Sequence, residues 1–400
     1  MWENPDHHES ICCPLCESEP EAAIVVGLKA RFDMAVRNIA CRRCGLVRID
    51  PRPTVDAMDA YYRGPYREQY GTVKIPHPTK GFVGREDAET FEEALVAQHT
   101  HQALIALRLA PHKRGAKVLE VGCRDGRTLA RMRDEHQLEV WGVEPGPAEA
   151  QEARERGIPV FEGLLEELDP GAPGAAAEFP ESFDHVQMFH VLEHIHDPLD
   201  ALIRMRQLLA PGGTLLIEVP NVACPYGPLE ANFFQNAHLF NFSANTLMAL
   251  FRRAGLLPEK LIDRTTLYLT GTVDPEVEAT ALPLPFDDGH LRDAWQDGCW
   301  VADSLDTYRH LERLRPTMES GQIDQDGVSS LLTLLKRPGF PTHTKLVLDT
   351  IVERLVTLGA PRIANTILQT ALAGPHPTSV LERWVEPAPA THPSDERPTS

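Results

Sequence analysis

Short apolar runs alternate with helical patterns from residue 117 to about residue 274. The strand-like runs are KVLEV, LEVWGVE, FDHVQMF and TLLIEVPN. The first three lead into stretches where apolar residues recur at helical spacing. This alternation predicts an α/β fold: a Rossmann-like, doubly wound, mostly parallel sheet with helices on both faces. EKLIDR and TLYLTGTV follow the helix after the fourth run and are predicted to pair as a hairpin, so the last strand is antiparallel.

The same pattern divides the chain into five parts. The first part is marked by cysteine pairs and short strands, and the second is rich in Pro, Gly and Tyr. The third part shows the α/β alternation, the fourth shows helical spacing, and the last is rich in proline. The expected parts are a cysteine-bearing module (1–60), linker and lid helices (61–110), the α/β domain (111–274), a helical C-terminal domain (275–384) and a disordered tail (385–400).

Charge and composition limit the partners. The formal net charge is −19, and a strongly acidic chain is repelled by phosphate backbones, so no nucleic acid is expected as a partner. The basic cluster of Arg42, Arg43, Arg48 and Arg52 is small. No apolar run of 18 residues and no signal peptide are visible, which predicts a cytoplasmic protein without a membrane span.

Four cysteines form two Cys-x-x-Cys pairs, Cys13 with Cys16 and Cys41 with Cys44. Two such turns can present four thiolates to a tetrahedral zinc ion, and four protein ligands leave no open position for catalysis. We therefore expect a zinc ribbon with a structural Zn²⁺ in residues 1–60. A reduced thiol cluster and a redox pair are the alternatives.

The turn after the first strand of the α/β domain carries two glycines in G-x-x-x-G spacing, Gly122 and Gly126. Dinucleotide-binding loops are usually G-x-G-x-x-G, and Glu120 would repel a pyrophosphate but suit a cationic ligand with an amino group. The next strand ends in Glu144, where an acid can accept hydrogen bonds from ribose hydroxyls. A cationic, ribose-bearing ligand without phosphate indicates S-adenosylmethionine.

An ordered series of segments carries a family resemblance: VLEVGCRDG, GVEPGP, FDHVQMFHVLEHIHDP and LLAPGGTLLIEVPN. In this series residues 117–272 resemble the class I S-adenosylmethionine-dependent methyltransferases. The resemblance implies a methyltransferase domain in which the cofactor contacts a set of loop and strand-end residues. These are Glu120, Gly122, Cys123, Arg124, Gly126, Glu144, Pro145, Leu164, Leu165, Met188 and Phe189. Core packing is the alternative for Leu164, Leu165 and Met188.

Arg124 departs from this pattern, because many members of the family have glycine there. A non-glycine residue in a left-handed turn costs about 1 kcal/mol, which a site held by its surroundings tolerates. Its side chain is expected either in solvent or beside an acid such as Asp125, Glu144 or Glu120.

The segment CRRCGLVRIDPRPTVDAMDAYY resembles a methyltransferase subgroup with an N-terminal zinc-binding module. Several members of that subgroup act on nucleotide sugars or natural-product intermediates, which implies a small-molecule acceptor here. The C-terminal helices do not match the sugar C-methyltransferases of the subgroup. They are expected to serve a homodimer or a protein partner instead.

Methyl transfer to an O–H or C–H nucleophile needs alignment and a base. His238, in NFFQNAHLFNFS, and His190, directly after the run FDHVQMF, are the predicted catalytic residues. His238 is expected to act as a general base or as a hydrogen-bond partner of the acceptor. An NAD(P)-dependent oxidoreductase and a non-catalytic zinc-containing scaffold are the alternative functions.

Overall fold

The computed structural model describes residues 5–63, 91–110, 113–169, 179–225, 228–263 and 265–287, with a few residues between 301 and 313. Residues 1–309 form one compact unit and residues 310–400 a second. The predictions for a C-terminal helical domain and a tail at 385–400 fall almost entirely outside the described residues.

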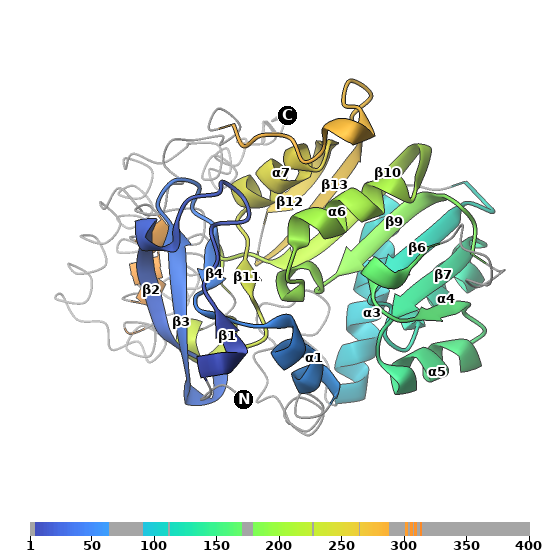
Figure 1. Ribbon diagram of the computed structural model, residues 1–400. Helices are drawn as coiled ribbons and strands as arrows, with labels where there is room; N and C mark the ends of the chain where they lie inside the picture. The colour runs from blue at the N-terminus through green and yellow to red at the C-terminus, as the bar shows by residue number, and fades with distance from the viewer. Residues whose placement is uncertain are drawn as a thin grey trace, which may run out of the picture. The chain divides into compact units, whose positions relative to one another are not determined.

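A seven-stranded sheet forms the centre of this unit, with the order β12-β13-β10-β9-β6-β7-β8 (Figure 1). The strand order reverses between β6 and β9, and β13 is antiparallel to both of its neighbours. The Rossmann-like α/β fold with an antiparallel last strand is thereby confirmed. The strands are β6 (Lys117–Val121), β7 (Glu139–Glu144), β8 (Val160–Glu162), β9 (Phe183–Phe189), β10 (Leu209–Pro220), β12 (Leu256–Asp263) and β13 (Thr266–Val273).

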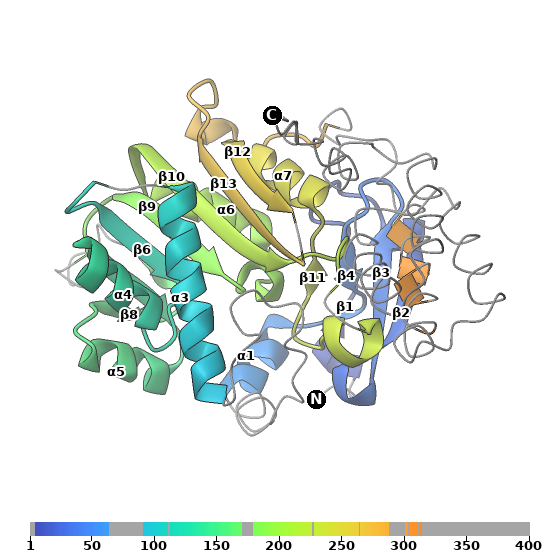
Figure 2. The same cartoon turned by 180° about the vertical axis from the view of Figure 1, so that it is seen from behind.

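Helices cover both faces of the sheet (Figures 1 and 2). The helices α3 (Phe91–Leu109), α4 (Arg127–His136) and α5 (Pro147–Glu155) lie on one face, and α6 (Pro198–Gln207) and α7 (Ala244–Arg253) on the other. Side chains along β6 alternate between the two cores: Val118 packs with the first group and Leu119 with the second. Among the described residues, no helix has the length and apolar character needed to cross a bilayer.

Local sequence signals explain where these helices begin and end. Asp197 and Ser243 accept hydrogen bonds from the backbone N–H groups of Asp200 and Thr246, so each caps the start of its helix. The sequence also predicts a PGG turn at 211–213. The structure instead continues β10 through it, with an irregular register between Leu209 and Thr214. A Cβ on Gly213 would lie 2.9 Å from the Ala210 carbonyl oxygen, so glycine allows the strand to bend there.

The N-terminal residues form a smaller sheet that includes a strand from the α/β part. Its order is β11-β4-β3-β2, and Phe240–Asn241 of β11 pairs with Val47–Arg48 of β4. A separate two-stranded sheet pairs β1 with β5, and one helix follows β5. The bounds are β1 (His8–Glu9), β2 (Ala23–Ala30), β3 (Met34–Cys41), β4 (Val47–Ile49), β5 (Arg52–Pro53), β11 (Phe240–Asn241) and α1 (Val55–Arg63).

Short helical turns complete the fold. They are η1 (Pro5–His7), η2 (Pro20–Ala22), η3 (Arg31–Asp33), η4 (Leu165–Glu167), η5 (Leu192–His194), η7 (Ala279–Ala281) and the single-turn π-helix η6 (Leu229–Phe233).

Candidate active site and metal centre

The loop between β6 and α4 can be built only with glycine at two positions. Gly122 and Gly126 have φ angles of 74° and 73°, in the left-handed region. A Cβ on Gly122 would lie 2.4 Å from Cγ2 of Val191, and one on Gly126 would lie 2.9 Å from Cβ of Ala153. Conformation and close packing therefore both require glycine, and the loop lies at the carboxyl end of β6, beside the reversal in strand order where open α/β sheets bind ligands.

Arg124 has a φ angle of 49°, so it does occupy a left-handed turn. Its backbone N–H donates to Oε2 of Glu144 over 2.9 Å, while its side chain is exposed. The backbone N–H of Gly146 donates to Oε1 of the same carboxylate over 2.8 Å. Burial nevertheless outweighs these bonds and raises the pKa of Glu144. The Arg124 backbone thus holds the acid at the end of β7, and its side chain is not needed for that contact.

Glu120, near the end of β6, is a buried carboxyl group. It is 4% exposed, and Nε2 of Gln187 on β9 donates to it over 2.7 Å. Burial raises the pKa of Glu120 to about 8 despite that hydrogen bond. A buried acid with so high a pKa would ionise more readily beside a cation, and this fits a ligand with a positive charge.

The other predicted cofactor residues divide by exposure. Leu164 and Pro145 are exposed, Leu164 by 47%, and follow the ends of β8 and β7. The remaining four, Cys123, Leu165, Met188 and Phe189, are each at most 7% exposed. Core packing is therefore the better interpretation for Met188 and Leu165, whereas Leu164 remains available to a ligand.

Two residues of this region escaped the sequence analysis. A Cβ on Gly142 would lie 2.3 Å from the sulfur of Cys123, so β7 needs a glycine where the loop cysteine packs. Gln187 donates to Glu120, and its own Oε1 lies 3.0 Å from Nε2 of His185 in the same buried strand. Gln187 stands between the apolar residues Val186 and Met188 of β9, which was the available signal for it.

A second polar cluster lies beyond β9. His190 Nε2 is 3.2 Å from Oε1 of Glu218, and its Nδ1 is 3.4 Å from Oε1 of Glu193. Burial alone would lower the pKa of His190, but the two carboxylates raise it to about 10. Tyr268 and Gln102 also donate to Glu218, over 2.8 and 2.7 Å. This arrangement keeps His190 as an imidazolium at neutral pH, unsuited to accept a proton.

His238 and His194 lie against each other, with ring centroids 4.8 Å apart. Nδ1 of His194 is 2.9 Å from the carbonyl oxygen of Ala237, which can only accept, so this nitrogen carries the proton. His238 is 4% exposed, and burial together with the nearby His194 and His190 lowers its pKa well below the usual value. Of the two predicted catalytic histidines, only His238 is thus held neutral and able to accept a proton.

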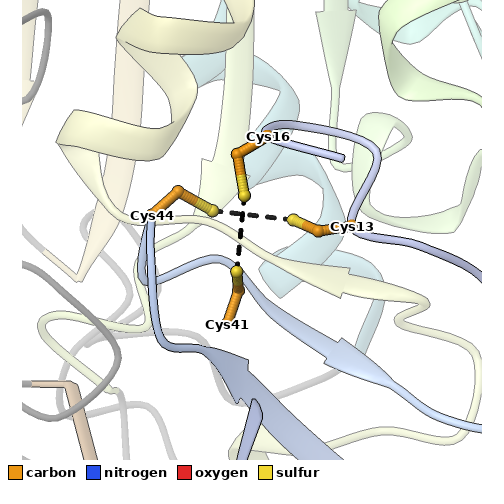
Figure 3. A group of neighbouring side chains, drawn as sticks. All are labelled: Cys13, Cys16, Cys41 and Cys44. Carbon is orange, nitrogen blue, oxygen red and sulfur yellow. Dashed lines mark hydrogen bonds between the residues drawn. The ribbon is translucent and has the colours of Figure 1, made fainter. Parts of the chain in front are cut away.

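The four cysteines of the N-terminal module meet at one point (Figure 3). Sγ of Cys13 lies 3.6 Å from Sγ of Cys44, and Sγ of Cys16 lies 3.4 Å from Sγ of Cys41. All four sulfur atoms lie within 4.8 Å of one another. Zinc–sulfur bonds of ~2.3 Å in a tetrahedron keep the sulfur atoms roughly 3.8 Å apart, so the cluster fits a zinc ion.

The two cysteine turns share one backbone geometry. The N–H of Glu17 donates to the Cys13 carbonyl oxygen over 2.7 Å, and the N–H of Gly45 donates to that of Cys41 over 2.9 Å. Glu17 and Gly45 both have positive φ angles, 63° and 75°. Burial raises the pKa of the Cys44 thiol, so a cation is needed to stabilise its thiolate.

Part of the chain is similar to known methyltransferases. The family described as a methyltransferase domain matches residues 95–260. A tRNA U34 carboxymethyltransferase from Idiomarina loihiensis is 27% identical over 216 residues, covering 50% of this chain and 58% of the relative. The O-methyltransferase cnsE from Penicillium expansum is 28% identical over 190 residues, covering 46% of this chain and 65% of the relative. The chain therefore spans less than two thirds of the length of these relatives.

Among solved structures, the Burkholderia thailandensis 1,6-didemethyltoxoflavin-N1-methyltransferase, with its substrate and S-adenosylhomocysteine bound, is 18% identical with a TM-score of 0.42. The match covers 62% of this chain and all of that one. The assignment rests on the family match, the sheet order and the glycine loop. Residues 95–260 are a methyltransferase domain of the class I S-adenosylmethionine-dependent family.

Proposed function

We propose that the protein transfers a methyl group from S-adenosylmethionine to a small-molecule acceptor, such as a sugar or a natural-product intermediate. One observation carries the proposal: Glu120, the Gly122–Gly126 loop and Glu144 lie together at the carboxyl ends of β6 and β7. Glu120 would hold the amino end of the cofactor, Glu144 its ribose hydroxyls, and Leu164 and Pro145 would flank the adenine.

The cofactor, when bound, supplies an electrophilic methyl group on a sulfonium with a neutral leaving group. The protein then has to exclude water, align the acceptor and remove its proton. His238 is the candidate for accepting that proton, because burial keeps its imidazole neutral. His190, paired with Glu193 and Glu218, would instead orient the acceptor as a hydrogen-bond donor.

Calorimetric titration with S-adenosylhomocysteine and with NAD tests the proposal. The wild type should bind the first and not the second. Glu144→Gln should weaken S-adenosylhomocysteine binding at least tenfold, since the ribose loses its charged partner. Glu139→Gln is the matched control, because Glu139 lies exposed at the amino end of the same strand. Binding of NAD alone would favour an oxidoreductase, and binding of neither would favour a scaffold.

A nucleic-acid acceptor is the second candidate, because one relative bears the name of a tRNA-modifying enzyme. The net charge of −19 opposes it. In the small basic cluster only Arg42 and Arg43 are exposed, since Arg48 is 1% exposed and Arg52 pairs with Glu9 over 2.7 Å. Electrophoretic mobility shifts with bulk tRNA at physiological salt should therefore show no complex.

We also propose that Cys13, Cys16, Cys41 and Cys44 hold one structural zinc ion. With four thiolate ligands the ion has no open position, so its contribution is to the fold of residues 1–60. Elemental analysis of the purified protein should give about one equivalent of zinc, and the double variant Cys13→Ser/Cys41→Ser should lose it. A metal-free native protein would refute this proposal.

A further inference from the structure

Three residues outside the cysteine cluster also bring potential metal ligands together. A carboxylate oxygen of Glu193 and one ring nitrogen each of His194 and His238 all lie within 4.8 Å of one another. Two of these residues are fully buried, and His194 is 19% exposed, so the group can be reached from solvent. We propose that Glu193, His194 and His238 bind a divalent transition-metal ion next to the methyltransferase site.

Unpaired buried atoms are the second observation. Oε2 of Glu193 and Nδ1 of His238 are buried and have no hydrogen-bond partner. Leaving a buried polar atom unpaired is costly, more so for a carboxylate. A metal ion coordinated by Glu193 and His238 would supply a partner for these two atoms.

The contacts around the cluster prepare the ligands for a metal. Because Nδ1 of His194 donates to the Ala237 carbonyl oxygen, Nε2 of this ring keeps its lone pair, and it lies 3.9 Å from Oε1 of Glu193. A backbone carbonyl that fixes the tautomer in this way is the usual support of a metal-bound histidine. His190 contacts Oε1 of Glu193 and leaves Oε2 without a partner.

The ligand types select the class of metal. Two imidazoles and one carboxylate suit Zn²⁺, Mn²⁺ or Fe²⁺ better than Ca²⁺ or Mg²⁺, which prefer oxygen ligands. Three protein ligands leave coordination positions open, in contrast to the cysteine cluster.

The position of the cluster connects it to the proposed reaction. Glu193 and His194 belong to η5, directly after Val191, whose side chain packs against Gly122 of the glycine loop. Resting on the proposed function, a metal here would bind the acceptor's hydroxyl oxygen and lower its pKa. His238 would then be a metal ligand and not the base, and the metal-bound hydroxyl group, acidified by the cation, would lose its proton to solvent water.

Mn²⁺ is a suitable probe because hard cations avoid the thiolate cluster. Full-length protein, freed of weakly bound metal with EDTA, is titrated with Mn²⁺ while electron paramagnetic resonance reports the free ion; Zn²⁺ uptake is counted in parallel. In the Mn²⁺ titration the wild type should bind one equivalent of Mn²⁺. In the parallel Zn²⁺ experiment it should take up one equivalent of Zn²⁺ in addition to the ion at the cysteine site. Glu193→Gln and His238→Gln should each weaken binding at least tenfold. His136→Gln, at an exposed position on α4, should bind like the wild type.

Two results would overturn the proposal: a wild type that takes up neither ion beyond the cysteine site, or variants that bind as the wild type does. The first needs no variant, so misfolding cannot hide it. Titration with S-adenosylhomocysteine on the same samples separates the two proposals. Binding of S-adenosylhomocysteine without a second metal ion would refute only the metal site. Binding of a second metal ion without binding of S-adenosylhomocysteine would refute only the methyltransferase function.

Discussion

At the residue scale, the two acids at the ends of β6 and β7 are held in different ways. Glu144 receives two backbone N–H groups, from Arg124 and Gly146, whereas Glu120 receives a single side-chain amide from Gln187. Glu120 is also fully enclosed, and burial raises its pKa to about 8. A cationic ligand would therefore stabilise the ionised form of Glu120, which burial disfavours in the ligand-free protein.

Glu120→Gln should make the ligand-free protein more stable at alkaline pH. The pKa of Glu120 is about 8 in the folded state and about 4.5 unfolded, so wild-type stability falls as pH rises from roughly 4.5 to 8. The variant lacks this loss. The difference between their free energies of unfolding should grow by about 1.4 kcal/mol per pH unit in that window. Urea unfolding at pH 5, 6, 7 and 8 measures it, with Glu139→Gln as the control.

The same Glu120→Gln variant should bind S-adenosylhomocysteine more weakly, because the neutral amide cannot pair with the ligand's ammonium. A difference in stability that stays constant from pH 5 to pH 8 would show that the carboxyl is already ionised in the folded protein. An unchanged affinity would remove Glu120 from the cofactor site.

A substitution at Gly122 should destabilise the protein and abolish ligand binding, whereas Arg124→Gly should leave ligand binding unchanged. Gly122→Ala adds a methyl group at a φ angle of 74° and 2.4 Å from Val191, so it should lower the unfolding temperature and abolish S-adenosylhomocysteine binding. Arg124→Gly removes the cost of a non-glycine residue in a left-handed turn, about 1 kcal/mol, and keeps the backbone N–H that donates to Glu144. It should bind the ligand as the wild type does. Thermal unfolding and calorimetry of both variants measure this, and weakened binding in Arg124→Gly would assign a role to the exposed side chain.

The site residues that could be predicted from the sequence are those whose partners lie close to them along the chain. The glycine loop and Glu120 stand in one short segment, so their spacing is visible in the sequence. Gln187, which donates to Glu120, lies 67 residues further on, and its pairing depends on the register of β6 with β9. Of the partners of His190, Glu218 comes from β10 and is brought close only by folding, whereas Glu193 lies in the same short segment.

At the element scale, α7 connects the methyltransferase sheet to the cysteine module. Arg253, in its last turn, donates to the carbonyl oxygens of Pro14 and Leu15 and pairs with Glu17 over 2.7 Å. Pro14 and Leu15 form the turn between Cys13 and Cys16, and Glu17 follows it. Since the Arg253 side chain is 6% exposed, the contact is shielded from solvent.

Arg253→Met should destabilise the protein by roughly 2–4 kcal/mol, because two buried carbonyl groups lose their donor. It should also speed the release of zinc to a chelator, as the first cysteine turn loses its support. Arg252→Met, one position earlier and partly exposed, is the matched control. Chemical unfolding and chelator kinetics measure the two effects. Equal zinc release from both variants would mean that the contact does not hold the cysteine turn.

The helices and strands with strong local signals were predicted well, and their pairing less so. The hairpin of β12 and β13 and the alternation of strands and helices from residue 117 to about residue 274 follow from short segments. The two-residue strand β11 carries no such signal, because it forms only by pairing with β4, almost 200 residues earlier in the chain. Part of the N-terminal sheet therefore could not be predicted from local pattern.

At the scale of the whole molecule, the cysteine module and the methyltransferase domain share one compact unit. They share a sheet through β11 and β4, and Arg52 donates to the His196 carbonyl oxygen while His196 contacts that of Pro53. Asn236 donates to the hydroxyl group of Tyr61, a buried residue of α1. These contacts place the loop carrying His238 between the module and the catalytic domain.

Loss of the proposed zinc should therefore affect the catalytic domain as well as the module. Because β4 supports β11 and the loop before it, Cys16→Ser/Cys44→Ser should lower the unfolding temperature of the whole compact unit in one transition. Cys12→Ser, at an exposed cysteine beside the cluster, is the control and should unfold like the wild type. Calorimetry of the three proteins, with zinc content measured on each, tests this. Two separate transitions, with an unshifted one still responsive to S-adenosylhomocysteine, would show that the methyltransferase domain folds without help from the cysteine module.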